Sequence, residues 1–114
     1  EAGAVLYNKY CATCHMANGK GDGSRFPPIA GSDWVTGDQT KLIDVVMNGL
    51  TGPIEVNGKP FGGTMPAVDY LEDEEIAQLL TYVRKEFGNN SPPIGSYYVK
   101  SRRYYAREKK LKSK

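Results

Sequence analysis

The sequence predicts a small all-α domain of three to four helices, with one small β-hairpin and a basic C-terminal extension. Apolar residues recur at helical spacing in three separate segments. The stretches between these segments are rich in glycine, proline, aspartate and serine, which is typical of loops. The 114 residues suffice for one small domain, and the absence of any run of roughly eighteen apolar residues predicts no membrane span.

The first helix is expected over residues 2–10, where Val5, Leu6 and Tyr10 lie near one face. Residues 16–37 are expected to form a loop, because glycine and proline recur along them. A second helix is expected from Asp38 to about Asn48. Its cap is Asp38 or Thr40, and Gly49 provides the stop.

A hairpin is expected within Glu55–Pro60, since Asn57-Gly58 is the strongest two-residue hairpin signal. The last helix of the body is expected from about Leu71 or Glu72 to Phe87, with acidic residues crowding its start. Its apolar face comprises Ile76, Leu79, Leu80, Val83 and, one turn later, Phe87; Gly88 and Asn89 end it.

Both cysteines and the single histidine of the chain fall in the pentad Cys11-Ala12-Thr13-Cys14-His15. A Cys-x-x-Cys-His motif is typical of a c-type haem attachment site. Each thiol forms a thioether with one haem vinyl group, and the histidine then ligates the iron. We therefore predict that the helices surround one haem c, bound covalently through Cys11 and Cys14 and ligated by His15.

Three other uses of the pentad fit the sequence less well. A redox dithiol of the thioredoxin sort accompanies a β-α-β pattern, which is missing here. A structural zinc site needs four ligands, and this chain offers only three Cys and His residues. A disulfide between Cys11 and Cys14 closes a very tight loop and leaves His15 without a role.

A methionine is the expected sixth ligand, because Met/His ligation raises the reduction potential and suits an electron carrier. Met16 adjoins His15 and cannot reach the opposite face. Met47 lies in an apolar helical run, where a core role is favoured. Met65 lies in a glycine-rich loop before Pro66, far enough along the chain to pass round the haem edge. We favour Met65, with Met47 as the alternative.

Further motifs follow the pentad in order: Gly19-Lys20-Gly21-Asp22-Gly23, Pro27-Pro28-Ile29-Ala30-Gly31, Met65-Pro66 and the helical segment 74–84. The ordered set resembles a class I c-type cytochrome of the small bacterial single-haem kind, over about residues 2–90. The resemblance implies the cytochrome c fold, in which the last helix crosses the first. Gly3 then either permits a close crossing or is an unconstrained residue at a frayed end.

The resemblance also implies that the carbonyl of Pro27 accepts a hydrogen bond from Nδ1–H of His15, with Pro28 as the alternative acceptor. Trp34 either donates its indole N–H to a haem propionate or is a plain core residue. Arg25 is expected to be a solvated loop residue rather than a propionate partner.

The predicted function is one-electron transfer by a His/Met-ligated haem c in a respiratory or dehydrogenase chain. The chain acts either as a free protein or as a subunit of a larger complex. With both axial positions filled, no catalytic residue is assigned and the chain is predicted not to be an enzyme. The alternative is a haem enzyme or gas sensor with a labile sixth ligand. We expect a periplasmic location, or the outer face of the cytoplasmic membrane, with a targeting segment already removed before Glu1.

The charge is divided unevenly between a haem domain at residues 1–90 and an extension at residues 91–114. Residues 1–95 carry seven basic and twelve acidic side chains, whereas residues 96–114 carry eight basic and one acidic. Tyr97, Tyr104 and Leu111 recur every seven residues, so that a helix would carry an aromatic stripe. Besides a redox donor and acceptor, the expected partner is a larger, membrane-associated complex that binds residues 96–114.

Three other states of the extension stay open: binding to an anionic membrane, folding back on the acidic domain, and a solvated, frayed terminus. Nucleic-acid binding is not expected outside the cytoplasm. Since the extension lies outside the resembling region, we expect its removal to leave the haem site nearly unchanged.

Overall fold

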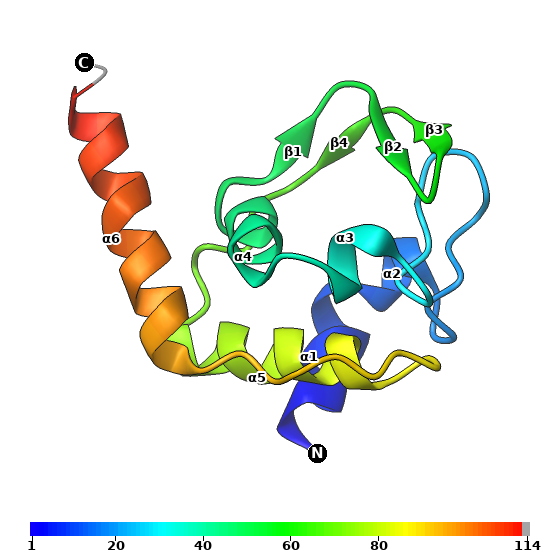
Figure 1. Cartoon of the computed structure of the whole chain (residues 1–114), viewed down its shortest axis with the longest axis horizontal. Helices are drawn as coiled ribbons and strands as arrows, with labels where there is room; N and C mark the ends of the chain where they lie inside the picture. Colours follow the sequence, from blue (N-terminus) through cyan, green and yellow to red (C-terminus); the bar gives the residue numbers. More distant parts are fainter. Residues whose placement is uncertain (113–114) are drawn as a thin grey trace.

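The computed structural model describes residues 1–112, so that Ser113 and Lys114, at the end of the expected extension, lie outside the described part. Within it, the longer helices are α1 (Ala2–Tyr10), α4 (Gln39–Asn48), α5 (Asp73–Lys85) and α6 (Ser96–Lys112) (Figure 1). Single turns form α2 (Ala12–His15) and α3 (Asp33–Thr36). The all-α class is confirmed, but α3 lies where the sequence predicted only loop.

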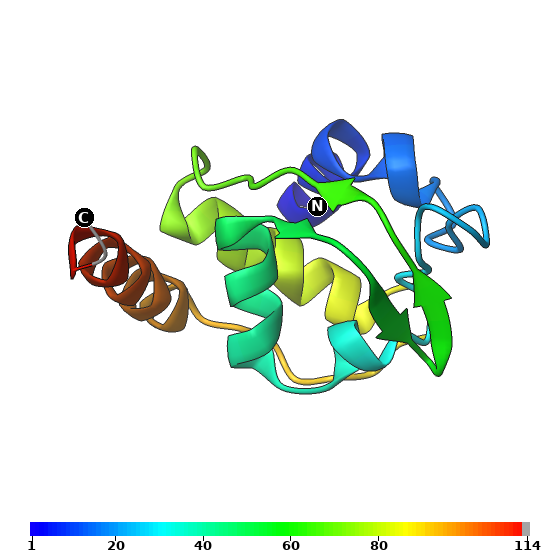
Figure 2. The ribbon, with the colours of Figure 1, turned by 90° about the horizontal axis from the view of Figure 1, so that it is seen from above.

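Helices α1 and α5 cross closely, and Gly3 lies at their contact (Figures 1 and 2). A Cβ at Gly3 would lie 2.5 Å from both the carbonyl oxygen of Gln78 and the Cβ of Tyr82, so the crossing requires glycine. The buried face of α1 carries Gly3, Leu6 and Tyr7. Val5 is 65% exposed, so its predicted place on that face is wrong.

The helix ends follow local side-chain chemistry. Asp38 caps α4, since its carboxylate accepts the Thr40 N–H at 2.9 Å, and Gly49 follows the helix with a φ of 74°. Helix α5 buries the apolar face expected from the sequence: Ile76, Leu79, Leu80 and Val83. Phe87 lies beyond the end of α5 with a φ of 60°, and its ring packs 5.1 Å from that of Tyr7.

Two small antiparallel pairs occupy the segment between α4 and α5. Strands β2 (Ile54–Val56) and β3 (Lys59–Phe61) form the hairpin predicted at Asn57-Gly58. Strands β1 (Leu50–Thr51) and β4 (Thr64–Met65) form a second pair, in which Leu50 faces Met65. The second pair was not predicted, and it fixes the position of Met65 relative to the end of α4.

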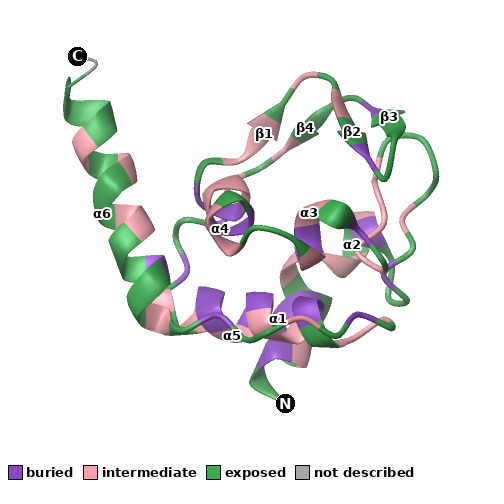
Figure 3. Cartoon of the chain, in the orientation of Figure 1, coloured by how far each residue is buried: buried purple, intermediate pink, exposed green. Residues whose placement is uncertain are grey.

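The extension forms a helix that packs on the body at its start. Val99 is fully buried, and α6 contacts both α4 and α5. Its far end extends away from the body and is largely exposed (Figures 1 and 3). In the described part of the chain, no helix is long and apolar enough to cross a membrane.

Candidate haem-binding site

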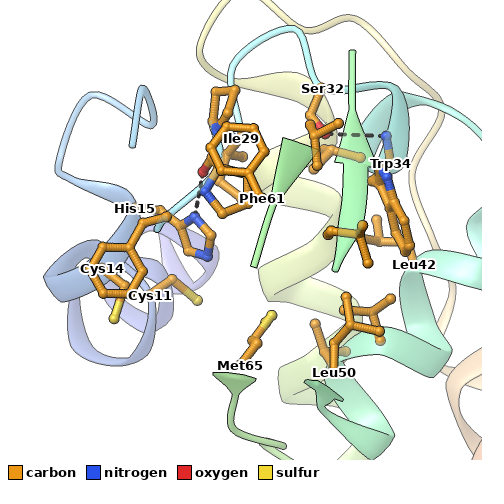
Figure 4. Close-up of a pocket in the computed structure, with 18 of the residues that line it drawn as sticks. Cys11, Cys14, His15, Ile29, Ser32, Trp34, Leu42, Leu50, Phe61 and Met65 are labelled. Carbon is orange, nitrogen blue, oxygen red and sulfur yellow. Dashed lines mark hydrogen bonds between the residues drawn. The ribbon is translucent and has the colours of Figure 1, made fainter. Parts of the chain in front are cut away.

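A cavity opens between α2, α4, α5 and the two strand pairs, and all the predicted site residues line it (Figure 4). Most of its wall is aliphatic or aromatic and includes Leu42, Val45, Val46, Ile54, Val56, Phe61, Leu79, Leu80 and Val83. An apolar wall of this kind suits a large flat macrocycle, since burying apolar surface is favourable.

Helix α2 and its N-cap residue Cys11 place both cysteines at the edge of this cavity. The carbonyl of Cys11 accepts the backbone N–H groups of Cys14 and His15, which closes the turn. Both side chains are half-buried free thiols, and burial raises the pKa of Cys11 to about 11, with the charge of Cys14 adding to the shift. Redox-active dithiols have lowered pKa values. The raised pKa of Cys11 is thus opposite to the shift that dithiol exchange requires.

His15 is buried, and its ring is held by one hydrogen bond. Its Nδ1 lies 2.8 Å from the carbonyl oxygen of Pro27, and not of Pro28. Burial lowers the pKa of His15, which the hydrogen bond to Pro27 opposes. The neutral ring donates from Nδ1, and this leaves the Nε2 lone pair directed into the cavity (Figure 4). A metal-ligating histidine has this arrangement.

The loop before Pro27 is closed by Asp22. Its carboxylate accepts the backbone N–H groups of Phe26, Arg25 and Ser24 at 2.8, 2.9 and 3.0 Å. These bonds, that from Phe26 most of all, hold the pKa of Asp22 below its ordinary value. The carbonyl of Phe26 in turn accepts the Asp22 N–H at 3.0 Å. Pro27, whose carbonyl accepts the hydrogen bond from His15, thus directly follows a well-defined turn.

The three methionines have different surroundings. Met65 lines the cavity from β4, with its sulfur directed into it (Figure 4). Met47 is 3% exposed in the hydrophobic core and is not among the residues that line the cavity. Met16 lies at the surface with a φ of 70°, and its carbonyl accepts the hydroxyl of Tyr7 at 2.7 Å. Of the three, Met65 shares the cavity with His15.

Trp34 lines the cavity, but its indole N–H donates to the carbonyl oxygen of Glu55 at 2.6 Å. An indole has only one donor, so a propionate could bind Trp34 only by replacing this bond to Glu55. The ammonium of Lys41 lies 3.9 Å from the ring centroid. Arg25 has an exposed side chain that reaches Asp22 at 3.7 Å, as expected for a solvated loop residue.

Several polar residues around the site were not found from the sequence. Tyr7 is almost fully buried and lines the cavity. Its position one turn after Gly3 puts both residues on the same face of α1, and this spacing is a sequence signal that Tyr7 is buried. Asn89 accepts the Gly31 N–H and donates to the carbonyls of Ile29 and Val83, which joins the proline loop to α5. No sequence signal distinguishes Asn89 from an ordinary residue after a helix stop.

Arg84 was also missed. It is 4% exposed, and its guanidinium donates to the carbonyls of Pro92, Val35 and Gly37 at 2.8–3.0 Å. Burial lowers its pKa. These bonds join α5 to α3 and to the start of the extension. Among residues 1–112, no group of three or more His, Cys, Asp or Glu side chains is arranged to hold a metal ion by itself.

A helical body around an apolar cavity, with a Cys-x-x-Cys-His turn at its edge, defines a haem c domain. Residues 1–86 match the Cytochrome c family, and the chain belongs to this family of electron carriers. One covalent haem c, attached through Cys11 and Cys14, is the cofactor, and when bound it supplies one-electron exchange between ferrous and ferric iron.

Similar proteins include a cytochrome c-552 and the cytochrome c subunits of two dehydrogenases. The cytochrome c subunit of the quinone alcohol dehydrogenase of Gluconobacter oxydans is 42% identical over 81% of this chain, but over only 20% of its own length. Cytochrome c-552 of Thermus thermophilus is 40% identical over 76% of this chain and 69% of its own length. The cytochrome c subunit of the gluconate 2-dehydrogenase of Pantoea cypripedii is 37% identical over 80% of this chain and 21% of its own length.

Proposed function

We propose that His15 and Met65 are the two axial ligands of the haem, and that the chain carries single electrons without catalysing a reaction. The arrangement of His15, Met65 and both cysteines around one cavity carries this proposal. The imidazole presents Nε2 to the cavity, and the thioether of Met65 enters it from β4 (Figure 4). A thioether ligand favours ferrous iron and raises the potential.

A haem enzyme or gas sensor with a labile sixth ligand is the second candidate. Such a site needs an open position beside polar groups that handle a substrate or gas. The cavity here has Met65 within reach of that position, among apolar residues such as Leu50, Ile54 and Phe61. This lining favours the electron carrier.

Optical spectroscopy of the ferric holoprotein tests the ligand assignment. A far-red charge-transfer band, present in the wild type and lost in Met65→Ala, is the expected result. Rapid binding of carbon monoxide to the reduced wild type, without that band, would favour the labile site instead.

We further propose that the chain works in the periplasm or at the outer face of the cytoplasmic membrane, in a respiratory or dehydrogenase chain. The names of the relatives support this setting, since two are subunits of dehydrogenases. The haem domain comprises residues 1–90, and residues 91–114 form an extension that binds a larger complex. Along α6 the side chains of Tyr97, Tyr98, Tyr104, Tyr105 and Leu111 are more than half exposed, as binding to a partner requires.

A further inference from the structure

Two consecutive arginines of α6 bind two different elements of the haem domain. Arg102 donates through Nε and Nη2 to the two carboxylate oxygens of Asp44 on α4, at 2.9 and 2.7 Å. Arg103 binds instead the segment that joins β4 to α5 and the first residue of α5. Its Nε donates to the carboxylate of Asp73 at 2.7 Å. Its Nη1 and Nη2 donate to the carbonyls of Asp69 and Leu71, both at 2.6 Å.

One planar guanidinium therefore binds three acceptors within five consecutive residues. The side chain of Arg103 is 16% exposed and that of Asp73 is 31% exposed, so solvent competes only in part for these bonds. Hydrogen bonds from a charged donor are stronger than neutral ones, and the rigid fork of arginine fixes the relative positions of its acceptors. Lysine could not make the same set of contacts.

The segment held by Arg103 begins four residues after Met65, and the chain between Met65 and this segment has little freedom to move. The N–H of Val68 donates to the carbonyl of Val46 on α4 at 2.8 Å, and the side chains of Val68 and Leu71 are buried. On the other side of Met65, strand β4 pairs with β1. A displacement of Asp69–Asp73 would therefore be transmitted to Met65.

We propose that Arg103 is a positioning residue for Met65. Arg103 holds the segment after Met65, so that the sulfur of Met65 stays over the cavity and is not readily replaced by another ligand. This inference rests on the proposed ligation by His15 and Met65. It departs from the sequence-based expectation that the extension is dispensable for the haem site. Helix α6 thereby becomes part of the support of the sixth ligand.

Competition by imidazole in the ferric holoprotein tests this role, because imidazole binds iron only when the methionine leaves. Arg103→Gln should raise the association constant for imidazole about tenfold, given the strength of charged hydrogen bonds. Arg102→Gln is the matched control: it lies on the same helix and loses a bidentate carboxylate contact, but its partner is on α4. We expect its imidazole affinity to stay within about twofold of the wild type. Arg103→Lys, which keeps the charge but not the fork, should resemble Arg103→Gln.

Unfolding by denaturant and the far-red band are measured on the same proteins. If Arg103→Gln loses stability but binds imidazole like the wild type, or if Arg102→Gln gains affinity equally, Arg103 does not position Met65. Met65→Ala separates this failure from that of the proposed ligation. If Met65→Ala keeps the far-red band, the ligand assignment itself is wrong. If Met65→Ala loses the band while Arg103→Gln is unchanged, only the positioning role is wrong.

Discussion

A Cβ placed on Gly49 would lie 2.7 Å from the carbonyl oxygen of Met65, so the end of α4 and strand β4 meet backbone to backbone. Gly49 also has a φ of 74°, a conformation that L side chains rarely adopt. Both the contact and the conformation depend on the absence of a side chain at this position. The residue that ends α4 thereby limits where Met65 can lie.

Gly49→Ala should lower the free energy of unfolding by roughly 2 to 4 kcal/mol and weaken the far-red band, because the clash pushes Met65 away. Gly58→Ala is the control, since Gly58 has a φ of 79°, is not among the residues that line the cavity, and a Cβ placed on it would meet nothing within 4 Å. It shares the conformational strain and lacks the clash. Denaturant unfolding and spectra of both variants make the comparison, and equal loss of the band in the two would argue against the contact.

Met65→Ala should lower the reduction potential and allow external ligands to bind, since the thioether no longer favours ferrous iron. Met47→Ala should act as a truncation in the core and lower the free energy of unfolding by roughly 2 to 5 kcal/mol, with the potential little changed. Redox titration and denaturant unfolding of both variants check this. Loss of the far-red band in Met47→Ala, with the band kept in Met65→Ala, would reverse the assignment.

Replacement of either Cys11 or Cys14 by serine should leave at most one thioether, because each thiol attaches to one vinyl group. Mass spectrometry of the denatured chain should show covalent haem in the wild type and in any single variant that matures. Acid-acetone extraction provides the control. If it removes the haem from the wild type, covalent attachment is wrong.

Acidification should loosen the loop that carries Pro27. The pKa of Asp22 lies below its ordinary value of 3.8 in the folded protein, because the backbone N–H groups of Phe26 and Ser24 bond the ionised form. A carboxylate whose folded pKa is depressed stabilises the fold above the unfolded pKa, and this contribution is lost as the pH falls through the folded pKa. Protection against amide hydrogen exchange at residues 24–26, taken relative to the intrinsic exchange rate at each pH, should therefore fall below about pH 3.8.

The same loosening should occur at neutral pH in Asp22→Ala, since the acceptor is removed. Arg25→Gln is the control, because the side chain of Arg25 is 77% exposed and its ion pair with Asp22 is long, at 3.7 Å. Surface ion pairs of this kind contribute little. If Arg25→Gln accelerates exchange as much as Asp22→Ala, the ion pair rather than the turn holds the loop.

Replacement of Tyr97, Tyr104 and Leu111 by serine should weaken association with the native complex and leave the haem spectrum unchanged. These side chains are exposed, whereas the contacts of α6 with the body include those of Val99, Arg102, Arg103 and Ala106. Aromatic anchors dominate the energy of many interfaces. Co-purification at two salt concentrations is the measurement. Binding that survives the replacements but disappears at higher salt would indicate electrostatic attachment to an anionic membrane.

Local sequence signals predicted much of the fold and the site. The Asp38 cap, the Asn57-Gly58 turn and the apolar face of α5 each depend on residues close in sequence, and the structure contains all three. The hydrogen bond from His15 to Pro27 was expected from the resemblance to class I c-type cytochromes, which left Pro28 as the alternative, and the structure contains the bond to Pro27.

Long-range polar contacts could not be predicted in this way. The β1–β4 pair spans only two residues on each strand, too few for a recognisable alternation. Trp34 had two possible uses for its indole N–H, and only the folded chain shows that Glu55 accepts it. The partners of Arg84, and two of the three partners of Arg103, are backbone carbonyls, which every residue offers, so the sequence carries no signal for these bonds.

Positive charge is concentrated on helix α6 and negative charge on the body, so the two signs lie apart along the length of the molecule. Arg102 and Arg103 lie beside carboxylates of the body, while Arg107, Lys109 and Lys112 follow toward the end that extends outward (Figure 1). An arm of this kind on an acidic body is a permanent electric dipole. In the field of a charged surface, a dipole experiences a torque, so the arm turns toward negative charge while the protein is still diffusing. Each collision then begins from a preferred orientation, and a higher ionic strength lowers the association rate more than it changes the dissociation rate.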